Sequence, residues 1–282
     1  MTRAFPFHYP ESPMREFVNT AIEAARKAGE LQLQGLRKKH KIDYKGEINL
    51  VTEVDRQCEE LILGLIGRRF PDHDILTEET PQLFKGSPYR WIVDPLDGTT
   101  NYVHGYPVFC VSIALEYMGE IVLGVVYDPT REELFVGQKG GGAFLNGEKI
   151  RVSQTRELSK GLLVTGFPYD LKEDPVNNLD HFTNMIMEAQ AVRRDGSAAL
   201  NLCYVASGRF DGFWELKFWP WDVAAGALIV KEAGGKVTDF DGRNFDPYGM
   251  EIVASNGLIH ESILKVLRKG RRPTIESRRF PM

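Results

Sequence analysis

The sequence predicts a mixed protein of helices and strands, α+β in its first half and α/β in its second. Two amphipathic helices open the chain, because apolar residues recur at helical spacing after Ser12-Pro13 and again after Thr52. A block rich in β-branched and aromatic residues follows, from about residue 90 to residue 138. From about Val152, short strands alternate with helices, which is typical of an α/β layer.

The two opening helices carry clear boundary signals. Ser12 can cap the first helix and Pro13 suits its first position, so we expect this helix to run to about Lys39. The polar stretch 41–50 contains Gly46 and predicts a mobile loop. The second helix is expected from Thr52 to residue 70, where Pro follows.

The remaining elements are read from short apolar runs between turn residues. We expect strands at 75–76, 90–93, 109–116, 121–127, 133–138, 162–165, 211–215 and 251–255. We expect further helices at 179–189, 198–206, 222–233 and 258–268. The change of pattern near residue 150 divides the chain into an N-terminal α+β subdomain (1–150), a C-terminal α/β subdomain (151–270) and a basic, flexible tail (271–282).

Composition excludes several classes of protein. The 282 residues carry a net charge of −4, which argues against nucleic acid as the main partner. The three cysteines (Cys58, Cys110, Cys203) lie far apart in apolar stretches and form no CxxC pair, so they indicate neither a disulfide framework nor a zinc site. No signal peptide or transmembrane run is apparent, and a cytoplasmic location fits.

The run Asp94-Pro95-Leu96-Asp97-Gly98-Thr99-Thr100-Asn101 carries the clearest functional signal. It places two carboxylates three residues apart at the end of an apolar stretch, where they can supply the oxygen ligands that Mg²⁺ prefers. The Gly-Thr-Thr turn that follows can offer backbone N–H groups to a phosphate. One short segment therefore combines a metal site with a phosphate site.

Other carboxylates could complete this site. Glu78 follows a short strand, although it could be an exposed loop residue. Asp222 opens an apolar helix within Trp219-Pro220-Trp221-Asp222, where it could cap the helix, bind a ligand, or do both. Glu215 ends a strand among aromatic residues and either is functional or points outward. The turn 195–198 could meet a ligand or merely cap the next helix.

This combination predicts metal-assisted hydrolysis of a phosphate ester. Two Mg²⁺ ions held by shared carboxylates would offset the charge of a phosphate dianion and lower the pKa of the attacking water. No side-chain nucleophile is then required, and the sequence contains no GxSxG elbow.

The motifs resemble those of the inositol monophosphatase family. Asp94–Asn101 and the run from Trp221 to Gly226 resemble its two signature motifs, and Glu78-Glu79 resembles its Glu-Glu metal element. The resemblance extends from about Glu16 to Leu267. It implies a layered αβαβα sandwich of the fructose-1,6-bisphosphatase type, a homodimer, and a lithium-sensitive phosphatase that uses two or three Mg²⁺ ions.

The resemblance also implies residue roles. One metal would be bound by Glu78, Asp94 and the Leu96 carbonyl, a second by Asp94, Asp97 and Asp222, and a third through Glu78 and water. The catalytic residues would be Glu78, Thr99 and Asp55, with Asp55 orienting Thr99 beside the attacking water. Gly98 and Thr99 would bind the phosphate, whereas Asp97, Ala198, Glu215 and Asp222 would line the polyol pocket. Lys45 would lie on a loop near the metals.

The substrate is less closely defined than the chemistry. Asn49 and the segment Gly166-Phe167-Pro168-Tyr169 differ from the animal enzymes and resemble bacterial members. The resemblance favours inositol 1-phosphate or a related sugar or polyol phosphate monoester. Fructose-1,6-bisphosphatase and histidinol-phosphatase activity are alternatives, and so is a binding role in a transcription or RNA-processing complex, for which the basic tail is the support.

Overall fold

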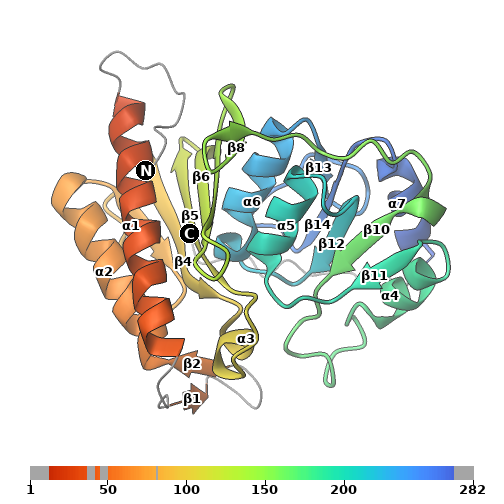
Figure 1. Ribbon diagram of the computed structural model, residues 1–282, viewed down its shortest axis with the longest axis horizontal. Coiled ribbons are helices and arrows are strands. Elements are labelled where there is room, and N and C mark those ends of the chain that lie inside the picture. Colours follow the sequence, from red (N-terminus) through yellow and green to blue (C-terminus); the bar gives the residue numbers. More distant parts are fainter. Residues whose placement is uncertain (1–12, 37–41, 45–49, 81, 270–282) are drawn as a thin grey trace.

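The computed structural model describes residues 13–36, 42–44, 50–80 and 82–269. Predictions that fall on Lys45, Asn49 and the tail 271–282 therefore lie outside the described residues. Figure 1 shows five layers, in which helices and sheets alternate across the longest dimension of the molecule. This arrangement is the αβαβα sandwich that the resemblance implies.

The elements have the following bounds. The helices are α1 (Pro13–Leu36), α2 (Glu53–Arg69), α3 (Thr99–Val103), α4 (Leu179–Ile186), α5 (Ala198–Ala206), α6 (Pro220–Glu232) and α7 (His260–Leu267), with a 3-10 turn at Leu158–Lys160. The strands of the first half are β1 (Ile42–Tyr44), β2 (Leu50–Thr52), β3 (Asp74–Thr77), β4 (Tyr89–Asp97), β5 (Cys110–Tyr117), β6 (Glu120–Asp128), β7 (Glu133–Gln138), β8 (Gly142–Leu145) and β9 (Glu148–Lys149). The strands of the second half are β10 (Leu162–Thr165), β11 (Ala191–Arg193), β12 (Gly212–Leu216), β13 (Lys236–Thr238) and β14 (Glu251–Ser255).

Two sheets form the β layers. The seven-stranded sheet follows chain order from β3 to β9, and all its neighbouring strands are antiparallel except β3 and β4. The five-stranded sheet has the order β11-β10-β12-β14-β13, in which β10 is parallel to both of its neighbours. A small hairpin pairs β1 with β2. The first large sheet is built from residues 74–149 and the second from residues 162–255.

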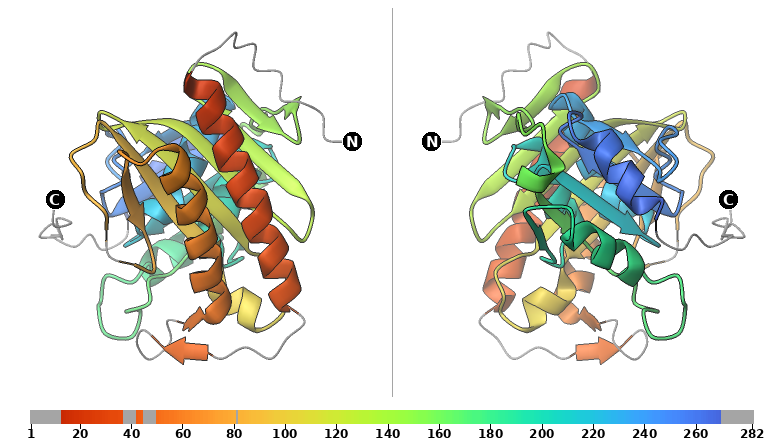
Figure 2. Two further views of the ribbon diagram at one scale, coloured as in Figure 1. Left: turned by 90° about the vertical axis from the view of Figure 1, so that its left-hand side faces the viewer. Right: turned by 90° about the vertical axis from the view of Figure 1, so that its right-hand side faces the viewer.

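Three buried apolar clusters hold the layers together. One lies between α1, α2 and the outer face of the seven-stranded sheet, which those helices cover in Figure 2. A second fills the space between the two sheets around α5 and α6. The third packs α4 and α7 against the far face of the five-stranded sheet. Strands buried on both faces explain why β4 and β5 are apolar at successive positions rather than at alternate ones.

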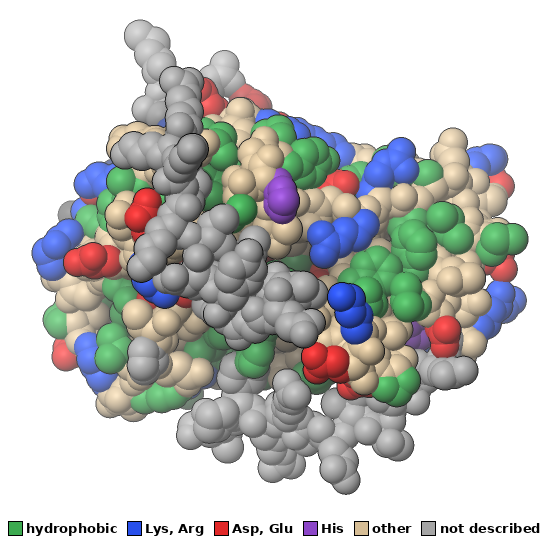
Figure 3. All heavy atoms as spheres, turned by 90° about the horizontal axis from the view of Figure 1, so that it is seen from below, with side chains coloured by type: hydrophobic (Ala, Val, Ile, Leu, Met, Phe, Trp, Pro, Cys, Tyr) green, Lys and Arg blue, Asp and Glu red, His purple; other side chains and the backbone are tan. Residues whose placement is uncertain are grey.

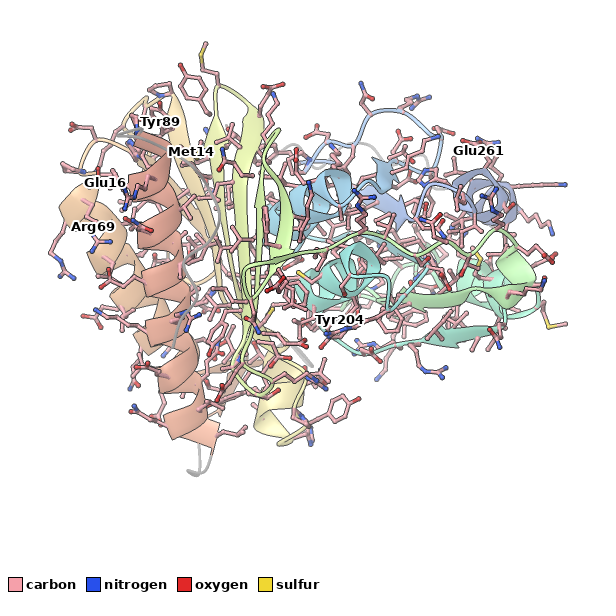
Figure 4. All side chains as sticks on the ribbon, turned by 45° about the horizontal axis from the view of Figure 1, so that its top comes forward. Met14, Glu16, Arg69, Tyr89, Tyr204 and Glu261 are labelled. Atoms are coloured by element: carbon pink, nitrogen blue, oxygen red, sulfur yellow. The ribbon has the colours of Figure 1, made fainter. Side chains whose placement is uncertain are left out.

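Local contacts fix the outer and central helices. Ala21, Ala24, Ala25 and Ala28 form the fully buried face of α1. Arg69 of α2 lies beside α1 (Figure 4), where its Nη2 pairs with Glu23 at 2.6 Å. In the central layer, the Tyr204 ring of α5 meets the edge of Phe135 in β7, with ring centroids 6.3 Å apart.

Most expected elements are present, and several differ in extent. The stretch 41–50 is not simply a loop, because Ile42–Tyr44 forms a strand against Leu50–Thr52. Strand β4 continues through Asp97 instead of ending at residue 93, and α4 ends at Ile186 instead of residue 189. The three-residue strands β11 and β13 were not expected. All three cysteines are buried and unpaired, as expected.

In the described part of the chain, no helix combines the length and apolar character needed to cross a bilayer.

Candidate active site

A bulge in β4 brings the two motif carboxylates to one side of the sheet. Asp94 pairs with Ser112 and Asp97 with Cys110, so β4 has two intervening residues where β5 has one. In a regular strand, the side chains of residues three apart point to opposite faces of the sheet. The extra residue of the bulge changes this alternation, so both side chains can point to the same face. Asp94 and Asp97 consequently line the same pocket. The Leu96 N–H donates to Asp94 Oδ1 at 2.9 Å, which fixes that carboxylate.

Asp97 is held at the start of α5. Its Oδ2 accepts hydrogen bonds from Ser197 Oγ at 2.6 Å and from the Ala199 N–H at 2.8 Å. Ser197 also caps the helix, since its hydroxyl accepts from the Leu200 N–H at 3.3 Å. The capping interpretation of the turn 195–198 is therefore confirmed, and the same serine positions the carboxylate of Asp97. Contact between this turn and a ligand stays a prediction.

The turn after Asp97 exposes the start of a short helix. Gly98 has φ of +96°, and a Cβ there would lie 2.8 Å from the Val108 carbonyl oxygen, so only glycine fits. The helix α3 begins at Thr99, and the first N–H groups of a helix have no partner within the helix. These groups are therefore available to an anion.

Asp55 orients the hydroxyl of Thr99. Thr99 Oγ1 lies 3.0 Å from Asp55 Oδ1 and 3.0 Å from the Leu96 carbonyl oxygen, and it can donate to either. Asp55 is itself fixed in the capping box of α2, where its Oδ2 accepts from the Thr52 N–H at 2.8 Å. The buried Asp55 thus joins the second helix to the motif.

Glu78 is placed by the one parallel pair of the large sheet. Thr77 of β3 lies opposite Val93 of β4, so the next residues, Glu78 and Asp94, emerge at the same edge. The buried carboxylate of Glu59 supports this turn, because its Oε2 accepts from the Glu79 N–H at 2.9 Å. Glu78 lines the same pocket as Asp94.

Asp222 and Glu215 approach from the second sheet and its helix. Asp222 is the third residue of α6 rather than its N-cap, and its Oδ2 accepts from the Trp219 N–H at 2.7 Å. Glu215 lies two residues after the buried Phe213 in β12, so both side chains face the central helices. A Cβ on Gly166 would lie only 2.2 Å from Glu215 Oε1, so this glycine makes room for the carboxylate.

These side chains share one pocket, whose empty space of about 700 Å³ includes the part that opens to solvent. Among the expected residues, it is lined by Glu78, Asp94, Leu96, Asp97, Gly98, Thr99, Ala198, Glu215 and Asp222. Asp55 lies behind Thr99, and Lys45 is outside the described residues.

The pocket disfavours the ionised form of its carboxylates. Burial raises the pKa of Asp94 well above its usual value, and Glu78, Asp97 and Asp222 raise it further. Burial likewise raises the pKa of Asp222 and brings that of Glu215 to about 8. Burial also raises the pKa of Asp97, although the hydrogen bond from Ser197 opposes this shift.

Such a group of carboxylates fits a hard divalent cation. Carboxylate oxygens and a backbone carbonyl are the donor types that Mg²⁺ prefers, and a cation among them would relieve the mutual repulsion that raises the pKa of Asp94. Across the described residues, no three His, Cys, Asp or Glu side chains are arranged to hold a metal ion as they stand. The donor types of the pocket thus fit Mg²⁺, whereas their present arrangement is not that of a formed metal site.

Several residues that line this pocket were not predicted as site residues. They are Phe167, Tyr169, Arg194, Asn201 and Trp219. Tyr169 is 54% exposed and lies at the solvent side of this lining. The aromatic residues beside Gly166 and Asp222 were the only available sequence signal.

Comparison with known proteins identifies relatives over nearly the whole chain. The model of the inositol monophosphatase family matches residues 13–272. "Inositol monophosphatase 2" of Solanum lycopersicum is 45% identical over 263 residues, which cover 91% of this chain and 99% of that protein. "Nus factor SuhB" of Pseudomonas aeruginosa is 40% identical over 272 residues, covering 93% of this chain and 100% of the relative.

Solved structures of related proteins have the same fold as this chain. The inositol monophosphatase from Anabaena (Nostoc) superposes with a TM-score of 0.85 at 45% identity, covering 92% of this chain and 98% of that one. A structure described as an IMPase/NADP phosphatase complexed with Mg²⁺ and phosphate has a TM-score of 0.78 at 27% identity, covering 91% and 95%. With the family match and these identities, this chain belongs to the inositol monophosphatase family.

Proposed function

We propose that this protein is a Mg²⁺-dependent phosphatase that hydrolyses inositol 1-phosphate or a related sugar or polyol phosphate monoester. One observation carries the proposal: acidic side chains from both halves of the chain and the start of α3 line a single pocket. A relative of the same fold that was solved with Mg²⁺ and phosphate supports the choice of cofactor.

The proposed metal ligands are the pocket carboxylates and one carbonyl. Glu78, Asp94, Asp97, Asp222 and the Leu96 carbonyl oxygen would hold two or three Mg²⁺ ions. When bound, the ions supply charge neutralisation for the phosphate dianion and lower the pKa of the attacking water. Asp94 contributes to both principal sites, so its loss should be the most damaging.

Thr99 and Asp55 would direct the attacking water. The Thr99 hydroxyl proton is directed to Asp55 or to the Leu96 carbonyl, which leaves the lone pairs of the hydroxyl oxygen to accept a hydrogen bond from water. The N–H groups of Gly98 and Thr99 would bind the phosphate. Glu78, the third proposed catalytic residue, would lie beside the same water.

The leaving alcohol would occupy the side of the pocket formed by the second sheet and the start of α5. Ala198 offers its backbone there, and Asp97, Glu215 and Asp222 offer carboxyl groups to substrate hydroxyls. Burial raises the pKa of Glu215 to about 8 in the metal-free pocket, and its carboxyl group can accept hydrogen bonds from substrate hydroxyls in either protonation state.

A small panel of substrates tests this proposal. We expect inositol 1-phosphate to have a higher kcat/KM than fructose 1,6-bisphosphate or histidinol phosphate. We also expect Asp94→Asn to abolish turnover while the circular dichroism spectrum and unfolding temperature stay near those of the wild type. Full activity in Asp94→Asn would refute the metal assignment, and a reversed order of substrates would favour one of the alternatives.

A second candidate function is a role in a transcription complex, which the relative named Nus factor SuhB favours. Of the basic residues near the C-terminus, Lys269 pairs with Glu188 at 2.9 Å. On the face in Figure 3, the described Lys and Arg side chains are scattered among acidic and apolar ones. Deletion of residues 270–282 with RNA and polymerase pull-down tests this role, and undiminished capture would exclude the tail.

The resemblance also predicts a homodimer and inhibition by lithium, and the composition of the chain predicts a cytoplasmic location. Light scattering of the purified protein tests the first of these predictions.

A further inference from the structure

Aromatic side chains form part of the pocket wall beside the carboxylates. They are Phe167, Tyr169, Trp219 and Trp221. The proposed chemistry uses carboxylates, one carbonyl, backbone N–H groups and the Thr99 hydroxyl, and it gives these rings no task. Small-molecule pockets commonly combine aromatic walls with a few polar groups that fix the orientation of the ligand. The aromatic part of this wall is therefore available to the leaving alcohol.

Trp219 differs from the other tryptophans of the chain in its exposure. Trp91 and Trp214 are fully buried and Trp221 is 8% exposed, whereas Trp219 is 43% exposed. An indole ring is among the largest apolar surfaces that a side chain can offer, and covering it is favourable. Because Trp219 lines the pocket, a ligand bound there can cover it.

Trp221 fixes the orientation of this exposed ring. The two indole rings are stacked, with centroids 5.3 Å apart and an angle of 7° between their planes. A nearly parallel ring thus covers one face of Trp219, so the exposed area lies on the opposite face and the edges. The stack forms a flat apolar surface that exists before any substrate enters the pocket.

The backbone ties Trp219 to the proposed metal site. Its N–H donates to Asp222 Oδ2 at 2.7 Å, and Pro220 begins α6 directly after it. The indole therefore stands in a fixed position relative to a proposed metal ligand. Because the donor is the backbone N–H, a substitution of the Trp219 side chain leaves this donor in place. The contribution of the ring can then be separated from that of the backbone.

The leaving alcohol of the proposed substrate suits such a surface. A cyclitol ring carries most of its hydroxyl groups around its edge and C–H bonds on its faces. An aromatic face is the negative part of the ring quadrupole, and it attracts these weakly positive C–H bonds. The carboxyl groups of Asp97, Glu215 and Asp222 would meet the hydroxyls, whereas Trp219 would meet the face. An acyclic polyol has no fixed face and must lose conformational freedom to form one.

We propose that Trp219 stacks on the apolar face of the leaving alcohol's ring, so that the pocket prefers phosphates of cyclic alcohols to those of acyclic polyols. This inference rests on the proposed phosphatase function and names the feature of the alcohol that the site selects. Trp219 takes no part in the cleavage of the ester, so its effect belongs to substrate affinity.

The test compares inositol 1-phosphate with sorbitol 6-phosphate, which has the same numbers of carbons, free hydroxyls and phosphates but no ring. Each is measured as a competitive inhibitor of p-nitrophenyl phosphate hydrolysis, because an inhibition constant does not depend on the affinity of the reporter. If only the polyol phosphates are hydrolysed, their KM values replace the inhibition constants.

The variants are Trp219→Ala, Trp219→Phe and the control Tyr117→Ala. Tyr117 is a matched control because it is 39% exposed, lies with its ring centroid 4.6 Å from that of Tyr89, and does not line the pocket. The phenylalanine variant keeps an aromatic face and should restore part of the lost affinity.

We expect the wild-type protein to bind inositol 1-phosphate at least about tenfold more tightly than sorbitol 6-phosphate. Trp219→Ala should reduce this ratio by about fivefold with kcat nearly unchanged, Trp219→Phe should reduce it less, and Tyr117→Ala should preserve it. A wild-type ratio near one, a ratio that survives in Trp219→Ala, or an equal loss in Tyr117→Ala would overturn the inference.

Two further outcomes separate this inference from what it rests on. Equal weakening of both ligands in Trp219→Ala would overturn it, because the ring would then act only by positioning Asp222. Inositol 1-phosphate that binds but is not hydrolysed would count against the proposed substrate and not against Trp219, since the ratio of inhibition constants does not require turnover. A protein that hydrolyses neither the reporter nor either polyol phosphate with Mg²⁺ would overturn both.

Discussion

Gly166→Ala tests the role of Glu215 without changing any charge. The added Cβ would lie 2.2 Å from Glu215 Oε1 and 2.4 Å from Oε2, whereas ordinary contact begins at 3.4 Å. The backbone cannot easily retreat, because the Gly166 carbonyl accepts a hydrogen bond from Asn178 Nδ2 at 2.6 Å. The Glu215 carboxyl must therefore move by about 1.2 Å, and a displacement of about 1 Å can cost up to about a hundredfold in rate.

We expect kcat/KM for inositol 1-phosphate to fall about 10- to 100-fold in Gly166→Ala, mostly through KM. The unfolding temperature should change little, since the displaced group is the end of a flexible side chain. The matched control is Gly67→Ala in α2, where a Cβ would meet nothing within 4 Å. This control should keep full activity and gain up to about 1 kcal/mol of stability. Undiminished kcat/KM in Gly166→Ala would refute a role for Glu215 in substrate binding.

Three further predictions concern stability and substrate affinity. Ser197→Ala removes both the cap of α5 and a hydrogen bond to Asp97, so urea denaturation should show a loss of about 3 kcal/mol; an unchanged midpoint would contradict this. Lys217 forms ion pairs at 2.7 and 2.6 Å with two carboxylates of the loop 166–178, part of which lines the pocket. Lys217→Met should therefore raise the KM for substrate. The control Lys160→Met breaks an ion pair on the surface and should leave KM unchanged. Burial raises the pKa of Glu215 from 4.5 to about 8; the folded state then holds more protons than the unfolded state between these values, and the metal-free protein should lose stability as pH rises through this window. Urea titrations at several pH values check this. Glu215→Gln should reduce the pH dependence and leave the part that comes from the raised pKa values of Asp94, Asp97 and Asp222.

The sequence could predict the layers because each has a strong local signal. Thr52 and the apolar residues that follow it at helical spacing predicted the second helix, and apolar runs predicted the strands of both sheets. The capping box that Thr52 forms with Asp55 became visible only in the structure. The strands β11 and β13 were not predicted because a strand of three residues is too short to show a periodic pattern. Likewise, the bulge at Asp94 and Asp97 depends on how β4 pairs with β5, and no pattern within one strand encodes it.

The pocket could be anticipated only in part. Its acidic residues stand in recognisable motifs, so their convergence followed from the resemblance. The remainder depends on tertiary geometry: Ser197 reaches Asp97 across 100 positions of sequence, and Asn101 reaches the Asp195 carbonyl across 94. Arg194 enters the pocket because Gly196 has no side chain. Such contacts join segments that are distant in the chain, and they leave no mark on local composition.

The central claim is that pocket carboxylates use divalent metal to hydrolyse a phosphate monoester. The most direct test is phosphate release from inositol 1-phosphate by the purified protein, measured with Mg²⁺, with EDTA, and with Mg²⁺ plus Li⁺. We predict release that requires Mg²⁺, stops with EDTA, returns when Mg²⁺ is restored, and is inhibited by Li⁺. Release that continues at the same rate in EDTA, or no release from a folded protein with saturating Mg²⁺, would contradict the account.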